Sequence, residues 1–230
     1  MATDKMEINI SDVMAAAVHD MKNSISTLIY SLDEIMAVCR DSGCKSYNSA
    51  PHLKYEAKRL TNNLVQMLTL YKMQNSQYLF NLSYNSVLDF IEENILYHKS
   101  ILDFRGINIE IECPDDLFCF FDRELVSGVI NNVINNLFKY TKDKIKVRAQ
   151  SKNGYVVINI DDNGGGYPDF LITADKPVNE SICFETGSTG LGLYFASIIA
   201  AMHENNGKKG FISVNNNGEY GSGRFEIFLP

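Results

Sequence analysis

Two interleaved heptad series near the N-terminus constrain the fold of this chain more than any other feature. The first series is Met14, Met21, Leu28 and Ile35, and the second is Val18, Ile25, Leu32 and Cys39. Because residues seven apart lie on one face of a helix, the two series together form one broad apolar stripe. The pattern predicts a long helix that packs in a bundle, with Ser11 and Asp12 as its N-terminal cap and Gly43 at its end.

A second helix is predicted after a break at Ser46–Pro51. Its apolar positions alternate between steps of four and three residues: Leu53, Ala57, Leu60, Leu64, Met67 and Tyr71. Two helices joined by a short connection form a hairpin, and one hairpin cannot bury both apolar stripes. We therefore expect residues 1–75 to form a dimerisation domain, in which two hairpins pair about a two-fold axis into a four-helix bundle.

The rest of the chain, residues 76–230, alternates between helical and strand-like patterns. Helices are predicted at Val87–Phe104, Arg123–Tyr140 and Leu191–Met202. Strands are predicted at Ile107–Cys113, Ile145–Ala149, Tyr155–Asp161, Phe211–Asn215 and Phe225–Leu229, the second and third as a hairpin across Lys152-Asn153-Gly154. Strands joined by hairpins and interleaved with a few helices favour an α/β sandwich over a doubly wound sheet.

Composition narrows the class of protein. The 230 residues carry 21 Lys and Arg against 28 Asp and Glu, and the net charge of −7 argues against nucleic acid as a partner. No apolar run approaches the roughly 20 residues of a membrane span, and the N-terminus lacks the pattern of a signal peptide. The 5 cysteines form no CxxC pair, which indicates free thiols in a reducing compartment. We expect a cytoplasmic protein.

His19 is the first candidate for chemistry. If Met14 lies on the heptad seam, His19 lies opposite it and faces solvent, with Asp20 beside it and Asn23 one turn further along the same face. An exposed histidine next to a carboxylate can act as a nucleophile, with the carboxylate orienting the ring or accepting its proton. An isolated histidine on the surface of a helix is more often simply solvated. A catalytic role for His19 is therefore supported only if the chain carries a second site with related chemistry.

The second site is spread over three segments that together fit a nucleoside triphosphate. Asn132, Asn136 and Lys139 lie near one another on a predicted helix, where an amide oxygen can ligate Mg²⁺ and the lysine can meet phosphates. Asp162 ends a predicted strand and opens a glycine run, so its carboxylate can accept a hydrogen bond from the amine of adenine. The segment Ser188–Leu193 opens a helix whose free N–H groups favour a phosphate. Each segment alone is weak evidence for a nucleotide site. The three segments in this order, after a helix with an exposed histidine, are strong evidence for one.

With these motifs the chain resembles the core of a sensor histidine kinase of two-component signalling. HDMKNSI resembles the phosphoacceptor box of that family, NNVINNLFKYT its N box, and DDNGGGYP and GSTGLGL its two glycine boxes. The ending GSGRFEIFLP also resembles the last strand of the family, so the likeness covers nearly the whole chain. It implies a dimeric helical hairpin with a phosphorylatable histidine, followed by a GHKL-type α/β sandwich that binds ATP with Mg²⁺.

The resemblance implies a role for each matching residue. His19 would accept the phosphoryl group, Asp20 would activate it, and Asn23 would position a water that dephosphorylates the partner protein. Asn136 would ligate the metal, and Asp162 would hold the adenine. The full set implied to bind the nucleotide is Asn132, Asn136, Lys139, Asp162, Gly164, Gly166, Thr189, Gly190, Leu191 and Gly192.

Four departures from the family pattern accompany the likeness. Ser24 stands where a proline is common, which predicts a straighter helix, and Leu137 stands where a small residue is usual, which predicts a more crowded pocket. Ser188 replaces the first glycine of the second glycine box. The segment that corresponds to the ATP lid, Tyr167–Gly187, is short and has Lys176 as its one basic residue. These departures predict slower turnover rather than a loss of ATP binding.

The preferred hypothesis is an ATP-dependent histidine kinase that phosphorylates itself on His19. It would pass the phosphoryl group to an aspartate in the receiver domain of a response regulator, and take its signal from a separate sensor protein or a sensor domain outside this sequence. One alternative is a histidine phosphotransfer or docking protein with a degenerate ATP-binding domain. Another is a GHKL protein of different activity, such as a serine kinase or an ATP-driven clamp, which would have no need of an exposed His19.

Overall fold

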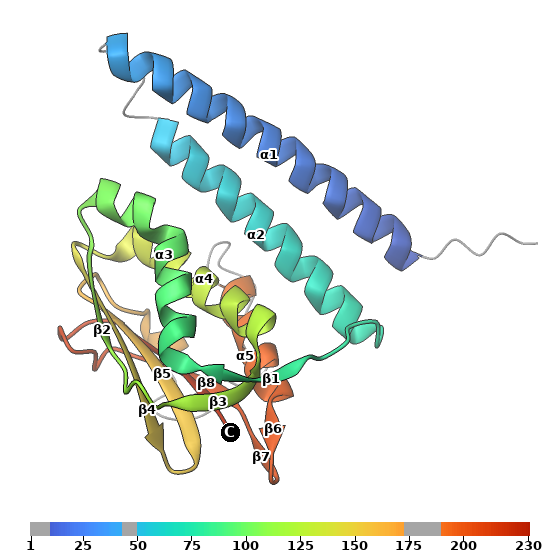
Figure 1. Ribbon diagram of the computed structural model, residues 1–230, viewed down its shortest axis with the longest axis vertical. Helices are drawn as coiled ribbons and strands as arrows, with labels where there is room; N and C mark the ends of the chain where they lie inside the picture. The colour runs from blue at the N-terminus through green and yellow to red at the C-terminus, as the bar shows by residue number, and fades with distance from the viewer. Residues whose placement is uncertain (1–9, 43–49, 173–189) are drawn as a thin grey trace, which may run out of the picture. The chain divides into compact units, whose positions relative to one another are not determined.

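The chain divides into two compact units, Met1–Leu79 and Phe80–Pro230 (Figure 1). The computed structural model describes residues 10–42, 50–172 and 190–230 of them. The first unit is helical, and the second combines helices with a sheet. Among the helices of these described ranges, none is both long enough and apolar enough to cross a membrane.

The N-terminal unit is a helical hairpin of α1 (Ile10–Ser42) and α2 (Ala50–Gln74). The two long helices predicted from the heptad patterns are therefore confirmed. However, α1 begins before Ser11 and Asp12, which lie in its first turn, so the prediction of an N-terminal cap at these residues is wrong. The stop predicted at Gly43 lies outside the described residues.

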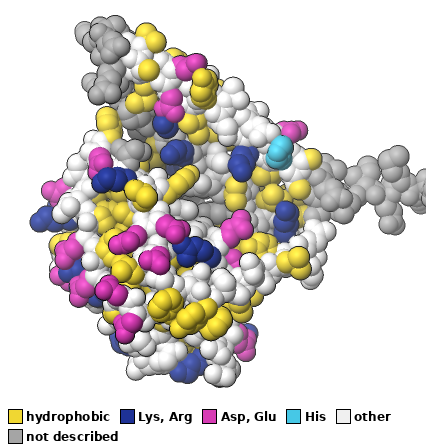
Figure 2. Space-filling view, viewed as in Figure 1, with side chains coloured by type: hydrophobic (Ala, Val, Ile, Leu, Met, Phe, Trp, Pro, Cys, Tyr) yellow, Lys and Arg dark blue, Asp and Glu magenta, His cyan; other side chains and the backbone are white. Residues whose placement is uncertain are grey.

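The two apolar series of α1 have different surroundings. Val18, from the second series, is buried. An ion pair joins the two helices, with 2.5 Å between Lys54 Nζ of α2 and Asp33 Oδ1 of α1. In the first series Met14 is half-buried, and the other three residues are exposed. Together with three exposed apolar residues of α2 they form what we call the outer stripe: Met21, Leu28, Ile35, Leu53, Leu60 and Met67. Figure 2 shows hydrophobic side chains open on the visible surface of the hairpin. One hairpin thus covers the second series more than the first and leaves the outer stripe in contact with solvent.

The C-terminal unit is an α/β sandwich built on a mixed five-stranded sheet. The strands, in order across the sheet, are β2 (Asn108–Glu112), β4 (Lys144–Lys152), β5 (Tyr155–Asp162), β9 (Arg224–Leu229) and β8 (Phe211–Asn215). β2 is parallel to β4, and the other neighbours are antiparallel. The helices packed with this sheet are α3 (Val87–Arg105), α4 (Arg123–Tyr140) and α5 (Gly190–Met202) (Figure 1). The predicted helices and strands are confirmed here, with ends shifted by up to three residues.

Two small sheets accompany the large one, and the sequence patterns predicted neither. They pair β1 (Leu82–Ser86) with β3 (Phe118–Asp122), and β6 (Glu204–Asn205) with β7 (Lys208–Lys209). β1 resembles a polar loop because its buried side chain is Asn85, not an apolar residue. The Asn85 amide donates to the carbonyl oxygens of Ser83 (2.8 Å) and Phe121 (3.1 Å), so its burial leaves the donor satisfied.

A buried histidine links the end of α5 to the start of α4. His203 Nε2 accepts a 3.0 Å hydrogen bond from the Asp122 N–H, so the proton lies on Nδ1, which donates to the Ile199 carbonyl at 2.8 Å. Asp122 in turn caps α4, because its Oδ1 accepts from the Leu125 N–H at 3.1 Å. Burial lowers the pKa of His203, although the Ile199 carbonyl and the charge of Asp122 oppose this. The imidazole is therefore held neutral.

Candidate functional site

A cavity of about 370 Å³ opens in the C-terminal unit, lined by α4, the segment after β5, and α5. Its walls are mostly apolar and aromatic, with one amide and one carboxylate among them: Val133, Asn136, Leu137, Tyr140, Asp162, Gly166, Tyr167, Pro168, Phe170, Leu171 and Leu193. The structure thus brings three of the predicted site residues, Asn136, Asp162 and Gly166, into one wall. A largely apolar cavity with a few convergent polar groups suits a flat, partly polar ligand such as a nucleobase.

Asp162 ends β5 and supplies the carboxylate of this cavity. Its Oδ1 accepts a 2.6 Å hydrogen bond from the Gly164 N–H, within the first glycine box. Burial raises the pKa of the Asp162 carboxyl, the Gly164 N–H opposes this, and the negative charge of Asp161 adds to the increase. A buried carboxylate with acceptor capacity to spare can hold an amine donor of a ligand.

Asn132 lies one turn before Asn136 and touches the first turn of α5, where Gly190, Leu191 and Gly192 are placed. Its side-chain Nδ2 is buried and has no hydrogen-bond partner within the described part of the chain. A Cβ at Gly192 would overlap the Asn132 amide, so only glycine allows this close approach. Because the first N–H groups of a helix also lack intrahelical partners, an anion here would satisfy both sets of donors. These residues fit the phosphate groups of a nucleotide.

Two other predicted features are placed differently from expectation. Lys139 is exposed and absent from the cavity wall, and its Nζ lies 5.3 Å from the centroid of the Tyr140 ring. Leu137, predicted to crowd the pocket, does form part of the wall, and the cavity remains open beside it. Thr189 and most of the segment that corresponds to the ATP lid lie outside the described residues.

The second group of predicted residues lies on α1, in the N-terminal unit. The His19 side chain is 71% exposed, which confirms that this position of the helix faces solvent. Its Nδ1 lies 3.6 Å from Asp20 Oδ1 and 3.2 Å from Asn23 Nδ2, so the carboxylate and the amide approach the same ring nitrogen. A proton on Nδ1 favours the Asp20 contact and leaves the lone pair of Nε2 free, whereas donation by the Asn23 amide requires the opposite tautomer.

Three residues around the cavity were missed by sequence reasoning as site residues. Tyr167 is a wall residue, and burial raises its pKa, with a further contribution from the charge of Asp162. It lies within the first glycine box, DDNGGGYP, so its position in the chain could have identified it. Asn216 and Ser222 hydrogen-bond to the glycine box from the segment between β8 and β9. Ser222 belongs to the ending GSGRFEIFLP, whereas no motif marks Asn216.

Comparison with known proteins connects this architecture to one family of ATPases. Residues 121–230 match the model of histidine kinase-, DNA gyrase B- and HSP90-like ATPases. The sensor-like histidine kinase SenX3 of Mycobacterium tuberculosis is 22% identical over 210 residues, which cover 87% of this chain and 50% of the relative. Sporulation kinase B of Bacillus subtilis is 23% identical over 223 residues, covering 96% of this chain and 49% of the relative. The chain spans about half the length of these curated relatives.

Solved structures agree on the fold. The histidine kinase AdeS of Acinetobacter baumannii aligns with a TM-score of 0.59 at 20% identity, covering 90% of this chain and 95% of that one. The nucleotide-free catalytic domain of the histidine kinase ThkA aligns with a TM-score of 0.54 at 21% identity, covering 65% of this chain and 97% of that one. Both helical and α/β parts of the chain therefore have counterparts in structures of histidine kinases.

Proposed function

We propose that this chain, which is similar to sensor histidine kinases and matches the ATPase model of the histidine kinase, gyrase B and HSP90 type at residues 121–230, phosphorylates itself on His19. The phosphoryl group would come from ATP and go on to an aspartate of a response-regulator receiver domain. The observation that carries this proposal is the buried carboxylate of Asp162 in the cavity, together with the unsatisfied amide of Asn132 on α4, which lies against the first turn of α5.

The cavity and the adjoining start of α5 hold different parts of the nucleotide. Asp162 accepts a hydrogen bond from the adenine amine, while the apolar wall around it excludes water. The Asn132 amide and the first N–H groups of α5 meet the phosphates. Asn136 supplies the amide oxygen for Mg²⁺, which when bound neutralises part of the phosphate charge.

At His19 the two ring nitrogens have separate tasks. With its proton on Nδ1, the ring directs that N–H toward Asp20, 3.6 Å away, and the Nε2 lone pair toward solvent. Nε2 then attacks the γ-phosphorus, so that a P–N bond forms while the P–O bond to the leaving ADP breaks. Asp20 stabilises the positive charge that develops on the imidazole and takes up the Nδ1 proton.

The outer stripe supports a homodimer as the working form. Six apolar side chains at heptad spacing are exposed along one hairpin, and pairing with a second hairpin would bury them in a four-helix bundle. Burial of each such side chain contributes roughly 1.5–3 kcal/mol. Two copies of His19 would then lie on the outer surface of one bundle, accessible to a receiver domain.

The kinase proposal is tested with γ-labelled ATP and Mg²⁺ on the purified chain and on His19→Gln. We expect an acid-labile, alkali-stable label on the wild-type chain and none on the variant. Binding of ATP is measured in parallel by thermal stabilisation, because a ligand that binds the folded state raises its stability. A chain that neither binds ATP nor acquires label would instead support the phosphotransfer alternative.

Asn23 is proposed to orient the water that removes the phosphoryl group from the regulator. Asn23→Ala should slow dephosphorylation of the regulator at least tenfold, whereas autophosphorylation of His19 should not fall, because the amide competes with Asp20 for Nδ1. The assay follows loss of label from phosphorylated regulator in the presence of each variant. Ser26→Ala, at another exposed position of the same helix, is the control. Equal dephosphorylation by Asn23→Ala would rule out this role.

A further inference from the structure

The segment between β8 and β9, residues 216–223, forms a turn that we call the β8–β9 turn. Its first residue, Asn216, makes two hydrogen bonds to one backbone unit of the cavity wall. The Tyr167 N–H donates to Asn216 Oδ1 at 2.7 Å, and Asn216 Nδ2 donates to the Tyr167 carbonyl at 2.8 Å. A single side chain thus fixes both backbone polar groups of Tyr167, the N–H and the carbonyl.

The same turn contacts the first glycine box at three further points. Ser222 Oγ donates to the Gly164 carbonyl at 2.8 Å, and the Asp162 N–H donates to the Gly223 carbonyl at 3.1 Å. Gly166 has a φ of +76°, and a Cβ there would lie 2.6 Å from Asn216 Oδ1. The two ends of the turn are therefore fitted to the glycine box.

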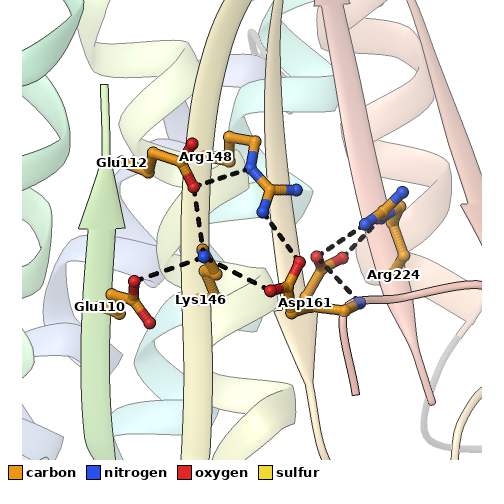
Figure 3. Close-up of polar contacts among 7 residues, drawn as sticks. Glu110, Glu112, Lys146, Arg148, Asp161 and Arg224 are labelled. Carbon is orange, nitrogen blue, oxygen red and sulfur yellow. Dashed lines mark hydrogen bonds and ion pairs between the residues drawn. The ribbon is translucent and has the colours of Figure 1, made fainter. Parts of the chain in front are cut away.

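On its other side the turn is anchored to the sheet by a network of ion pairs (Figure 3). The Glu219 N–H donates to Asp161 Oδ2 at 3.2 Å, and the Glu219 carboxylate lies 2.9 Å from Arg148 and 3.5 Å from Lys146. Arg224 donates twice to Asp161, at 2.6 and 2.8 Å. Asp161 is fully buried, so this end of the turn is tied to the rigid part of the unit.

These contacts matter because the three successive glycines of the first glycine box have no side chains with which to hold their own position. The run Gly164-Gly165-Gly166 gains backbone freedom from its composition, and any restraint must come from outside it. Asp162, Gly166 and Tyr167 all line the cavity, so a shift of this run would move the carboxylate and the wall together.

We propose that Asn216 is a positioning residue for the nucleotide, which sets the cavity wall through the backbone of Tyr167. The proposal rests on the proposed function, since it concerns the same cavity. Loss of the two hydrogen bonds should leave the cavity present but loosely shaped, so that nucleotide affinity falls while the chemistry at His19 continues once the site is saturated.

The test compares Asn216→Ala with the matched control Asn217→Ala in the full chain. Asn217 is the exposed neighbour, and only its backbone N–H makes a hydrogen bond within the described chain, to Asn215 Oδ1 at 2.9 Å. For Asn216→Ala we expect the Kd for MgADP and the KM for ATP to rise about tenfold, a size typical of one to two net hydrogen bonds, with kcat within about threefold of wild type. Asn217→Ala should match the wild-type chain in all three.

Two further variants sharpen the test, and the first keeps it decisive if Asn216→Ala folds poorly. Asn216→Asp is nearly isosteric and keeps the acceptor for the Tyr167 N–H but loses the donor to the Tyr167 carbonyl, so it should also weaken binding. Gly166→Ala should cost less affinity in the Asn216→Ala background than in wild type, because one partner of the steric overlap is gone.

The outcomes separate this proposal from the proposed function. Nucleotide binding by the wild-type chain together with unchanged Kd and KM in Asn216→Ala and Asn216→Asp would overturn the positioning role alone. Equal falls in kcat and affinity would also overturn it, because they would indicate general damage to the unit. Absence of nucleotide binding by the wild-type chain would overturn both.

Discussion

Asp162 carries a negative charge into a mostly apolar cavity, and this burial has consequences for binding. Water is a poor competitor for a carboxylate in such surroundings, so a hydrogen bond to a ligand amine gains strength there. The Gly164 N–H occupies Oδ1 and keeps the carboxylate oriented. The same burial raises the pKa of the group, so its charge is lost at a higher pH than that of an ordinary aspartate.

Asp162→Asn should therefore weaken ATP binding by about 10- to 100-fold, since hydrogen bonds to charged groups contribute roughly 1.5–3 kcal/mol. Asp169→Asn, at an exposed position of the short helix Asp169–Leu171, is the control and should bind normally. Calorimetric titration across pH should show the wild-type affinity falling as Asp162 becomes protonated, at a pH above the usual value near 4. Unchanged affinity in Asp162→Asn would exclude it as the adenine acceptor.

At the scale of elements, α5 is fixed at both ends. Its first turn packs on Asn132 beside the cavity, and its last turn is joined through His203 to Asp122, the N-cap of α4. The two helices that line the cavity are thereby coupled by one neutral imidazole. Protonation of His203 would remove the acceptor at Nε2 and place a positive charge among buried groups.

This arrangement predicts that stability is lost as the pH falls. The folded pKa of His203 lies below its ordinary value, so between about pH 6.5 and that lowered pKa the unfolded chain binds a proton that the folded chain does not. The free energy of unfolding should fall by up to about 1.4 kcal/mol per pH unit in this window. His203→Leu should be less stable at pH 7.5 by about 1–3 kcal/mol and should have a flatter pH dependence.

Urea unfolding at several pH values measures this effect, followed by circular dichroism because the chain has no Trp. His19→Gln, a substitution at an exposed histidine of α1, is the control. A slope in His203→Leu equal to that of the wild-type chain would show that another group is responsible.

At the scale of the whole molecule, the two units differ in how completely each buries its apolar side chains. The C-terminal unit places large residues such as Phe90, Phe121 and Phe225 fully inside, and it has a core of its own. The hairpin keeps Val18 buried but leaves Leu28 60% exposed. The N-terminal unit is thus the part that needs a partner surface, and a second copy of the same stripe is the simplest one.

Leu28→Glu should therefore convert a dimer into a monomer, because a carboxylate would be buried at the centre of the outer stripe. Light scattering should give twice the chain mass of 25.9 kDa for the wild type and the single value for the variant. Ala37→Glu places the same charge on α1 outside the stripe and should remain dimeric. A monomeric wild-type chain would contradict the four-helix bundle.

Local patterns in the sequence were sufficient for much of this protein. Heptad spacing predicted both hairpin helices and the exposure of His19, and strand-like patterns, with period-two alternation in Ile107–Cys113, predicted the strands of the large sheet. The motif residues Asn136 and Asp162 were predicted to meet, and they line one cavity. Such features depend on neighbours within a few turns or strand positions, so the sequence records them directly.

Contacts between distant segments required the tertiary structure. β1 escaped detection because its inward Asn85 is satisfied by Phe121, 36 residues away. Asn216 hydrogen-bonds to Tyr167, which lies 49 residues away in the sequence. The Asn132 amide is seen to be buried without a hydrogen-bond partner only once Gly192 is placed against it. The amino-acid sequence by itself determined which helices and strands form and which motifs they carry. Only the tertiary structure decided which polar groups find partners, because hydrogen bonding depends on ångström-scale distances that no sequence spacing specifies.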